Sequence, residues 1–366
     1  MARPIPYMSA MAQTAIKSRI YLDHAATTPA IPAAIAAMTT TAAVVGNPSS
    51  VHAGGRAANA ILEAARDAVA AWAGCQPDAV IFTSGGSEAL ALALNTPWRV
   101  LAGATEHSAV LAARADATLL PVDGDGVIDL AALAAALQGG PALVAVQHAN
   151  NETGVIQPIA EIAALVAAAG GQLVVDAVQS AGKLAFPQAD FVAVSAHKLG
   201  GVPGTGALIA RNPALVMAVQ RGGGQERGLR GGTANLPGIA AFAAAIAEPR
   251  DWDRVAALRD ALETRLGTIV HGAGASRLPN ISNLALPGVP AASQVMALDL
   301  AGFMVSAGAA CSSGKVSVSH VLAAMGVAAP GEAIRVSLGP DTTGAEVDAF
   351  CDAWHVMAAR LQQRAA

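Results

Sequence analysis

Two charged side chains each follow an apolar run that has the length of a β-strand. Asp176 comes directly after Leu173–Val175, and Lys198 comes four residues after Phe191–Val194. A buried carboxylate can hold a pyridinium nitrogen protonated, and a neighbouring amine can form a Schiff base with an aldehyde. The chain has only four lysines, and Lys198 alone stands between an apolar run and a glycine-rich turn. The pair therefore predicts pyridoxal 5'-phosphate (PLP) as cofactor, anchored by Lys198, and chemistry on amino acids.

A phosphate site is predicted where a strand ending at Thr83 meets the sequence Ser84–Glu88. Free backbone N–H groups and the helix dipole at such a junction favour an anion, here at Gly86 and Ser87. For a glycine pair alone, a capped turn between a strand and a helix is the alternative. Three further residues carry hydroxyl or N–H groups that suit phosphate oxygens: Ser195, His197 and Thr233.

Other polar residues are predicted to surround the cofactor ring and the substrate. His107 follows another strand, where a flat imidazole can stack on a pyridine ring and act as acid or base. The loop His148–Gly154 contains Asn150 and Asn151, whose amides can bind a ring hydroxyl or a substrate group. Gln179 can reach the phenolic oxygen of the same ring. The alternatives are a structural histidine and a turn built by asparagine side chains.

The C-terminal third contributes a candidate nucleophile and a candidate substrate anchor. Cys311 stands among small, hydroxyl-bearing and glycine residues, which predicts an exposed loop where a thiolate can form. Cys75 and Cys351 stand beside apolar residues and are predicted to be inert. Arg335 lies inside an apolar run, where its charge requires an anion, and a substrate carboxylate matches the guanidinium. A buried ion pair with an acid of the protein is the alternative.

The composition limits the class of protein. The chain has 366 residues, a net charge of −4 and 13% charged residues, which allows one large and one smaller core and gives no sign of nucleic-acid binding. Its apolar stretches are shorter than the roughly 18 residues of a membrane span. The N-terminus has no compact apolar run with a small-residue cleavage site, so we expect no secretory signal. Three cysteines without metal-ligand spacing predict a reducing compartment, the cytoplasm. The 54% of hydrophobic residues predicts a homo-oligomer.

Apolar runs of strand length alternate with alanine-rich helical stretches, which predicts an α/β fold with a mainly parallel sheet covered on both faces. The runs are 80–83, 99–102, 118–122, 143–147, 173–176, 191–195 and 206–210. The helical stretches are 55–72, 87–94, 108–115, 130–137 and 159–169, followed by 236–247 and 251–266. Ligands collect at the carboxyl ends of such strands. We expect a large PLP-binding domain over 31–250 and a small α+β domain, formed by 1–30 and 251–366, that carries the Cys311 loop.

The order of these residues resembles that of the cysteine desulfurases, which are fold-type I PLP enzymes of the class V aminotransferase group. The resemblance is to the nitrogen-fixation and iron–sulfur type. It runs from Tyr21–Pro29 and Gly46–Ser50 to Arg335–Gly339. It implies a mainly parallel seven-stranded sheet in the large domain. The chain departs from the family pattern at Ala307 and Ala309, where many members have serine.

The resemblance implies a role for each predicted site residue. Lys198 would form the covalent bond to the cofactor, Asp176 would pair with the ring nitrogen, Gln179 would contact the ring hydroxyl and His107 would stack on the ring. The phosphate would be bound by Gly86, Ser87, Ser195, His197 and, from a second subunit, Thr233. Asn151 and Arg335 would bind the substrate, and Cys311 would take the sulfur.

The implied reaction converts L-cysteine to L-alanine and leaves the sulfur on Cys311 as a persulfide, for iron–sulfur cluster or thio-cofactor synthesis. The implied partners are a second copy of the chain and an iron–sulfur scaffold or other sulfur-acceptor protein. The alternatives are a selenocysteine lyase or another class V aminotransferase-type enzyme, and a PLP-free sulfur carrier. An NAD-dependent dehydrogenase fits the alternating strands, but the glycine-rich turn that it needs after the first strand is missing.

Overall fold

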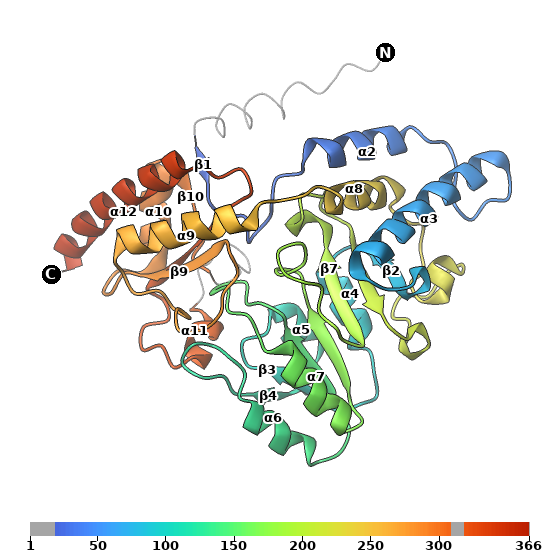
Figure 1. Ribbon diagram of the computed structural model, residues 1–366, viewed down its shortest axis with the longest axis horizontal. Coiled ribbons are helices and arrows are strands. Elements are labelled where there is room, and N and C mark those ends of the chain that lie inside the picture. The colour runs from blue at the N-terminus through green and yellow to red at the C-terminus, as the bar shows by residue number, and fades with distance from the viewer. Residues whose placement is uncertain (1–18, 309–317, 366) are drawn as a thin grey trace.

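The computed structural model describes residues 19–308 and 318–365 (Figure 1). A seven-stranded sheet, called the large sheet below, lies at its centre, and the predicted mainly parallel arrangement is confirmed. Its strand order is β2-β8-β7-β6-β5-β3-β4, and β8 runs antiparallel to both of its neighbours. The strands are β2 (Val80–Thr83), β3 (Val100–Gly103), β4 (Thr118–Leu120), β5 (Leu143–Gln147), β6 (Gln172–Asp176), β7 (Phe191–Ser195) and β8 (Gly206–Ala210).

Alternating side chains of these strands enter two different cores, as expected for a sheet that is covered on both faces. Val144 and Val175 pack on one face with α3, α6, α7 and α8, whereas Ala145 and Val174 pack on the other with α4. Both sets are apolar, which explains the continuous apolar runs in the sequence. The helices are α2 (Pro32–Ala42), α3 (Ala53–Ala73), α4 (Gly86–Ala93), α5 (Ser108–Ala113), α6 (Leu130–Leu137), α7 (Ile159–Ala168) and α8 (Leu236–Ile246).

Two predicted elements are shorter by two residues than the sequence indicated. The run 118–122 forms a strand only to Leu120, because Pro121 has no N–H group to continue the ladder. The helix over 108–115 ends at Ala113, because Arg114 leaves the helical conformation. The Arg114 side chain then bonds to the carbonyl oxygens of Leu94, Thr96 and Trp98.

A second core lies beside the large sheet and is built from the C-terminal elements (Figure 1). A two-stranded antiparallel pair, β9 (Ile281–Ala285) and β11 (Ala333–Ser337), forms what we call the small sheet. The helices around it are α9 (Trp252–Leu266), α10 (Ala291–Leu300), α11 (His320–Ala324) and α12 (Gly344–Ala365). The predicted boundary at residue 250 falls between α8 and α9; the division into domains stays a prediction.

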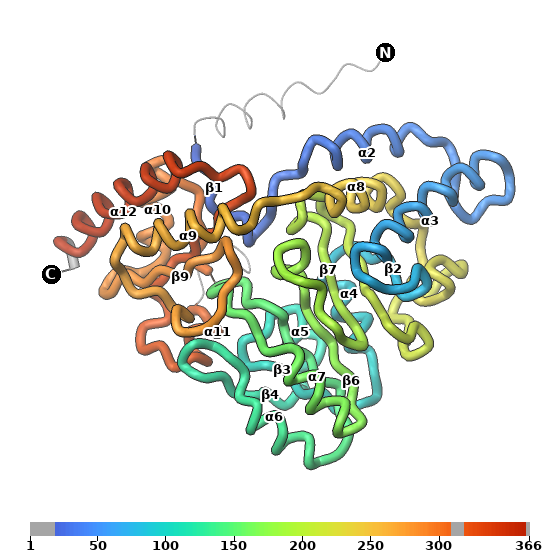
Figure 2. Tube along the Cα trace, viewed as in Figure 1, coloured from blue at the N-terminus to red at the C-terminus, as the bar shows by residue number. Residues whose placement is uncertain are grey.

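The N-terminal end of the described chain joins this C-terminal region. Strand β1 (Ile20–Tyr21) pairs in parallel with β10 (Phe303–Met304), and Figure 2 shows the two segments side by side. Leu22, which follows β1, is fully buried in the second core. The next residue, Asp23, lies beside β11, where its backbone forms a bridge to Ser337. None of the helices in the described part of the chain combines the length and the apolar character that crossing a membrane requires.

Candidate active site

A cavity of about 430 Å³ lies between the carboxyl ends of the large-sheet strands and the small sheet. Most of the predicted site residues line it, and they come from segments that are far apart in the sequence. They are Gly86, Ser87, His107, Asn151, Asp176, Gln179, Ser195, His197, Lys198 and Arg335. The sequence therefore predicted which side chains would meet.

Asp176 ends β6 and faces this cavity from a buried position, with 8% of its surface exposed. One carboxylate oxygen, Oδ1, accepts a hydrogen bond of 2.9 Å from the Val178 N–H. The other oxygen has no partner among the described residues. Burial raises the pKa of the carboxyl, while that bond and the charges of His107 and Lys198 oppose the rise. An open oxygen on a buried acid suits a cationic ring nitrogen.

Lys198 lies in a short 3₁₀ turn, Ala196–Lys198, directly after β7. Its Nζ donates to the carbonyl oxygens of Ala25 and Ala26, at 2.5 and 2.6 Å. Burial, with a smaller contribution from the charge of Arg335, lowers the pKa of Lys198 to about 8. A fraction of the amine is therefore neutral near pH 7, and a neutral amine is the form that attacks an aldehyde.

His107 stands at the start of α5, where its Nδ1 accepts a hydrogen bond of 3.1 Å from the Ala109 N–H. Burial lowers the pKa of the imidazole. The ring is therefore neutral near pH 7 and carries its proton on Nε2, because Nδ1 is an acceptor. The structural alternative is partly realised, since His107 caps a helix. The cap also fixes the ring at the cavity wall, so ring stacking stays a prediction that the geometry allows.

The first turn of α4 brings backbone N–H groups to the same cavity. Gly86 and Ser87 begin the helix, and their N–H groups have no carbonyl partner within it. A Cβ atom added at Gly86 would lie 2.5 Å from Val178 Cγ2, so the close approach requires glycine. Ser195 and His197 line the cavity from the end of β7. This set of hydrogen-bond donors suits a phosphate group.

Gln179 and the two asparagines of the loop His148–Gly154 differ in the hydrogen bonds that their side chains make within the protein. Gln179 Nε2 donates 2.8 Å to the Ala25 carbonyl oxygen. Asn150 is used inside its own loop: its Oδ1 accepts from the N–H groups of Glu152 and Thr153, at 2.8 and 2.9 Å. The alternative of a turn built by asparagine is thus correct for Asn150, whereas Asn151 lines the cavity.

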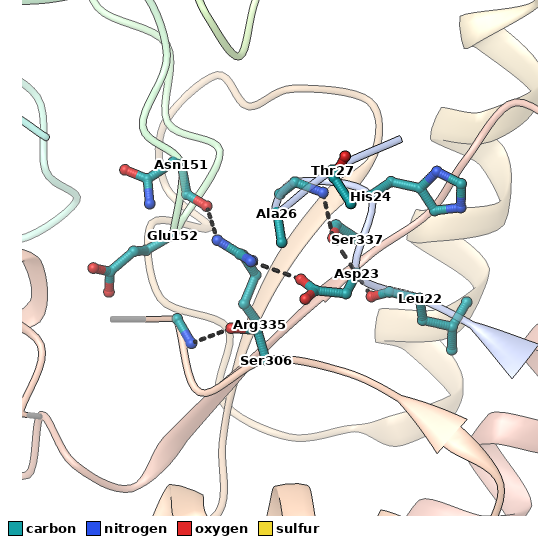
Figure 3. A network of polar contacts seen from close by, with 12 residues as sticks. Leu22, Asp23, His24, Ala26, Thr27, Asn151, Glu152, Ser306, Arg335 and Ser337 are labelled. Carbon is teal, nitrogen blue, oxygen red and sulfur yellow. Dashed lines mark hydrogen bonds and ion pairs between the residues drawn. The ribbon is translucent and has the colours of Figure 1, made fainter. Parts of the chain in front are cut away.

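Arg335, in β11, forms an ion pair across the cavity wall (Figure 3). Its Nη2 donates 2.7 Å to Asp23 Oδ1, and its Nη1 donates 2.9 Å to the Asn151 carbonyl oxygen. The third donor, Nε, is buried and has no partner among the described residues. The alternative of an ion pair with a protein acid is therefore what the structure shows. Substrate binding by Arg335 stays a prediction.

Two of the predicted site residues, Thr233 and Cys311, are not among the residues that line this cavity. Thr233 lies instead in hollows shared with Glu226 and Ala234. Its phosphate contact from a second subunit stays a prediction. Cys311 lies outside the described residues, and Gly308, shortly before it in the chain, lines the cavity.

No role for Asp23 was predicted from the sequence, although Asp23 forms the ion pair with Arg335. The only local signal was an acid directly after the short apolar run Ile20–Leu22. Glu106, beside His107, was also missed. Its carboxyl is 1% exposed, Oε1 accepts 2.8 Å from the Gln147 N–H, and Oε2 has no partner among the described residues. Burial raises the pKa of Glu106 well above its usual value.

The chain matches known proteins over nearly its whole length. The family model for class V aminotransferases matches residues 20–350. A cysteine desulfurase of Cereibacter sphaeroides is 42% identical over an alignment of 361 residues, which covers 90% of this chain and 93% of that protein. An IscS-like cysteine desulfurase of Mycobacterium tuberculosis is 37% identical over 94% of this chain and 98% of its own length. The crystal structure of a NifS-like protein from Rickettsia africae superimposes with a TM-score of 0.86 at 30% identity, covering 93% of this chain and 99% of that one.

The chain belongs to the class V aminotransferase family. Members of this family depend on PLP, and the cavity fits that group. The open oxygen of Asp176, the amine of Lys198 with its lowered pKa, and the N–H groups of α4 are the partners that a pyridine ring, an aldehyde and a phosphate require.

Proposed function

We propose that this protein is a cysteine desulfurase, which converts L-cysteine to L-alanine and passes the sulfur to Cys311. The observation that carries the proposal is one cavity in which Asp176, Lys198 and Arg335 meet, in a chain that is 42% identical to a cysteine desulfurase. Asp176 and Lys198 serve the cofactor, and Arg335 serves the carboxylate of an amino acid.

The residues on the large-sheet side manage charge and protons. Bound PLP supplies an electron sink for the negative charge that forms at the Cα atom of an amino acid. Asp176 keeps the pyridine nitrogen protonated, which strengthens that sink. Lys198 takes the Cα proton as general base, because its lowered pKa leaves part of the amine neutral. His107 would hold the ring by stacking on it, because its cap on α5 fixes the imidazole at the cavity wall.

The residues on the other side orient the substrate and receive the sulfur. Arg335 and Asn151 hold the cysteine carboxylate beside Lys198. The Cys311 thiolate attacks the sulfur of the bound cysteine. An S–S bond forms, the C–S bond breaks with its electron pair on Cβ, and Cβ takes up a proton. Lys198 returns to Cα the proton that it took from there. L-alanine leaves, and Cys311 keeps a persulfide.

The assembly and the destination of the sulfur are part of the proposal. The protein forms a homodimer in which Thr233 of each copy reaches the phosphate in the other copy. The Cys311 persulfide passes to an iron–sulfur scaffold or another sulfur-acceptor protein of the cytoplasm. Exposed apolar side chains support an interface between copies: Val45, Val51 and Val219 are 90%, 89% and 60% exposed in the single chain.

The test is incubation of the PLP-loaded protein with L-cysteine and a reductant, with alanine and sulfide measured together. Equal amounts of both products are expected, because each turnover breaks one C–S bond. A keto acid without sulfide would instead identify an aminotransferase and would contradict the proposal.

A further inference from the structure

The segment 221–233, between β8 and α8, sends a charged side chain to the helix end that is predicted to bind the phosphate. Arg230 Nε donates 2.7 Å to Glu88 Oε1, and Arg230 Nη2 donates 3.3 Å to Glu88 Oε2. Glu88 lies in the first turn of α4, directly after Ser87. The two side chains are only 19% and 24% exposed. The chemistry described above gives this ion pair no role.

Glu88 is also bonded to the turn that precedes α4. Its Oε2 accepts a hydrogen bond of 2.6 Å from the Ser84 N–H, so the carboxylate closes back on the start of the helix, as in a capping box. Burial alone would raise the pKa of the Glu88 carboxyl, but hydrogen bonds from Arg230 and Ser84 lower the pKa below its usual value. Glu88 is therefore ionised near pH 7. It fixes the turn and also places a negative charge at the helix end.

That charge opposes the binding of a phosphate at the same helix end. A carboxylate and a phosphate repel each other, and both are attracted by the positive end of the helix dipole. Arg230 forms a two-point contact with Glu88, which compensates the charge of the carboxylate without breaking its bond to Ser84. The ion pair thus keeps the turn fixed and removes the charge that would repel the anion.

The segment that carries Arg230 is itself held against the large sheet by a second ion pair. Glu226 accepts 2.8 and 2.9 Å from the two Nη atoms of Arg66 in α3, and 3.0 Å from the Phe82 N–H in β2. Its side chain is 5% exposed. Glu226 and Arg227 have positive φ angles of 45° and 57°, which cost free energy in residues other than glycine. These contacts stabilise the strained backbone, so the place of Arg230 is set by the fold.

We propose that Arg230 is a positioning residue for the cofactor: it compensates the charge of Glu88 and so allows the first turn of α4 to hold a phosphate. The inference rests on the proposed function, which places that phosphate at Gly86 and Ser87. Arg230 does not line the cavity and acts through Glu88. Its effect is therefore limited to ligands that carry a phosphate. Pyridoxal, which lacks the phosphate, does not depend on it.

The experiment is equilibrium dialysis of the PLP-loaded protein against decreasing concentrations of free PLP, with the bound cofactor measured by its absorbance. Arg230→Met removes the charge and keeps most of the side-chain length; it should weaken PLP binding about tenfold. Glu88→Gln removes the opposing charge and keeps an acceptor for the Ser84 N–H, so it should bind PLP at least as tightly as the unaltered protein. The double variant Glu88→Gln/Arg230→Met should return to within about threefold of the unaltered protein.

Two controls separate this role from a purely structural one. The same dialysis with pyridoxal should give equal affinities in all variants. Arg221→Met, at an exposed arginine of the same segment, removes the same charge without breaking the Glu88 pair and should keep the PLP affinity within about twofold. A purely structural ion pair would give the opposite pattern, in which both single variants weaken PLP binding and the double variant recovers nothing.

Unchanged PLP affinity in Arg230→Met, weaker PLP binding in Glu88→Gln, or an equal loss of pyridoxal affinity would overturn the inference. A failure of the proposed function gives a different result, because the unaltered protein would then retain no PLP or release no sulfide from L-cysteine. Normal PLP affinity together with normal sulfide release in Arg230→Met removes only the inference.

Discussion

The large-sheet side and the small-sheet side of the cavity differ in how far their polar groups are already paired. On the large-sheet side, Asp176 has an open oxygen and the first N–H groups of α4 have no carbonyl partner within the helix. On the small-sheet side, Arg335 already bonds to Asp23 and to the Asn151 carbonyl oxygen, and only Nε is left without a partner among the described residues.

This difference matches the two kinds of ligand in the proposal. A cofactor that stays bound can satisfy the open groups of the large-sheet side permanently. A substrate enters and leaves in every turnover, and Asp23 neutralises Arg335 between turnovers. The cysteine carboxylate must then compete with a protein carboxylate for the same guanidinium, which trades affinity for release. Substitutions on the two sides should therefore change different kinetic parameters.

The largest effect is expected on the large-sheet side, at Lys198. Lys198→Ala removes both the covalent anchor and the general base, so turnover should fall by about 10⁴-fold or more. Lys198→Arg keeps the positive charge without a usable amine and is the matched control; it should be equally inactive. Measurable alanine production by either variant would show that another group does this work.

Cys311→Ala should abolish sulfide release while the cofactor absorbance still changes on mixing with cysteine. The reason is that the thiol acts only after the substrate has bound. Cys75→Ala is the control, since burial raises the pKa of that thiol and keeps it protonated. Parallel assays of sulfide and absorbance check the pair, and sulfide release by Cys311→Ala at the normal rate contradicts the assigned nucleophile.

Asp176→Asn should lower kcat by about 100-fold or more, because breaking a buried ion pair costs about 3 kcal/mol and each 1.4 kcal/mol is a factor of ten. Asp190→Asn is the control, because Asp190 directly precedes the neighbouring strand β7, and its Oδ2 accepts 2.8 Å from the Leu173 N–H near the amino-terminal end of β6. That variant should keep kcat within about twofold. Similar losses in both variants would mean that Asp176 acts through the fold.

Arg335→Lys should raise the KM for cysteine about 10- to 100-fold with a smaller change in kcat, because lysine cannot form the bidentate contact. The measurement is steady-state kinetics with cysteine varied to saturation. An effect on kcat alone would place Arg335 in the chemical step and would remove the contrast between the two sides.

The smallest effect is expected from Asp23→Asn, through the pKa of Lys198. The apoprotein should take up PLP faster as pH rises through about 8, where Lys198 loses its proton. The charge of Asp23 raises the pKa of Lys198, so its removal should move this profile to lower pH. The KM for cysteine should also fall, because the competing carboxylate is gone. If Asp23→Asn leaves the pH dependence of PLP uptake unchanged, Asp23 does not influence the pKa of Lys198.

The sequence predicted the strands of the large sheet well because both faces are buried in every strand except the edge strand β4. Continuous apolar runs such as 143–147 are then visible without any partner strand. The strand order and the antiparallel direction of β8 were beyond such reasoning, since pairing depends on contacts between distant segments. The residues at the strand ends followed from the same runs, which explains why Asp176 and His107 were predicted together.

Residues whose roles depend on long-range pairing were not predictable. Asp23 meets Arg335 across 312 positions of sequence. The expected small domain already combined 1–30 with the C-terminal region, but no local pattern indicated that these two side chains would pair. Glu88 was visible at the start of a predicted helix, but its contact with Arg230 depends on how the segment 221–233 packs. Local patterns locate strand ends, whereas the partner of a buried charge is set by the whole fold.

The most direct test of the account is borohydride reduction of the PLP-loaded protein, followed by peptide mapping. Reduction fixes the cofactor to the amine that holds it. We expect a single labelled lysine, Lys198. A label on Lys183, Lys17 or Lys315, or the absence of any label, would contradict it.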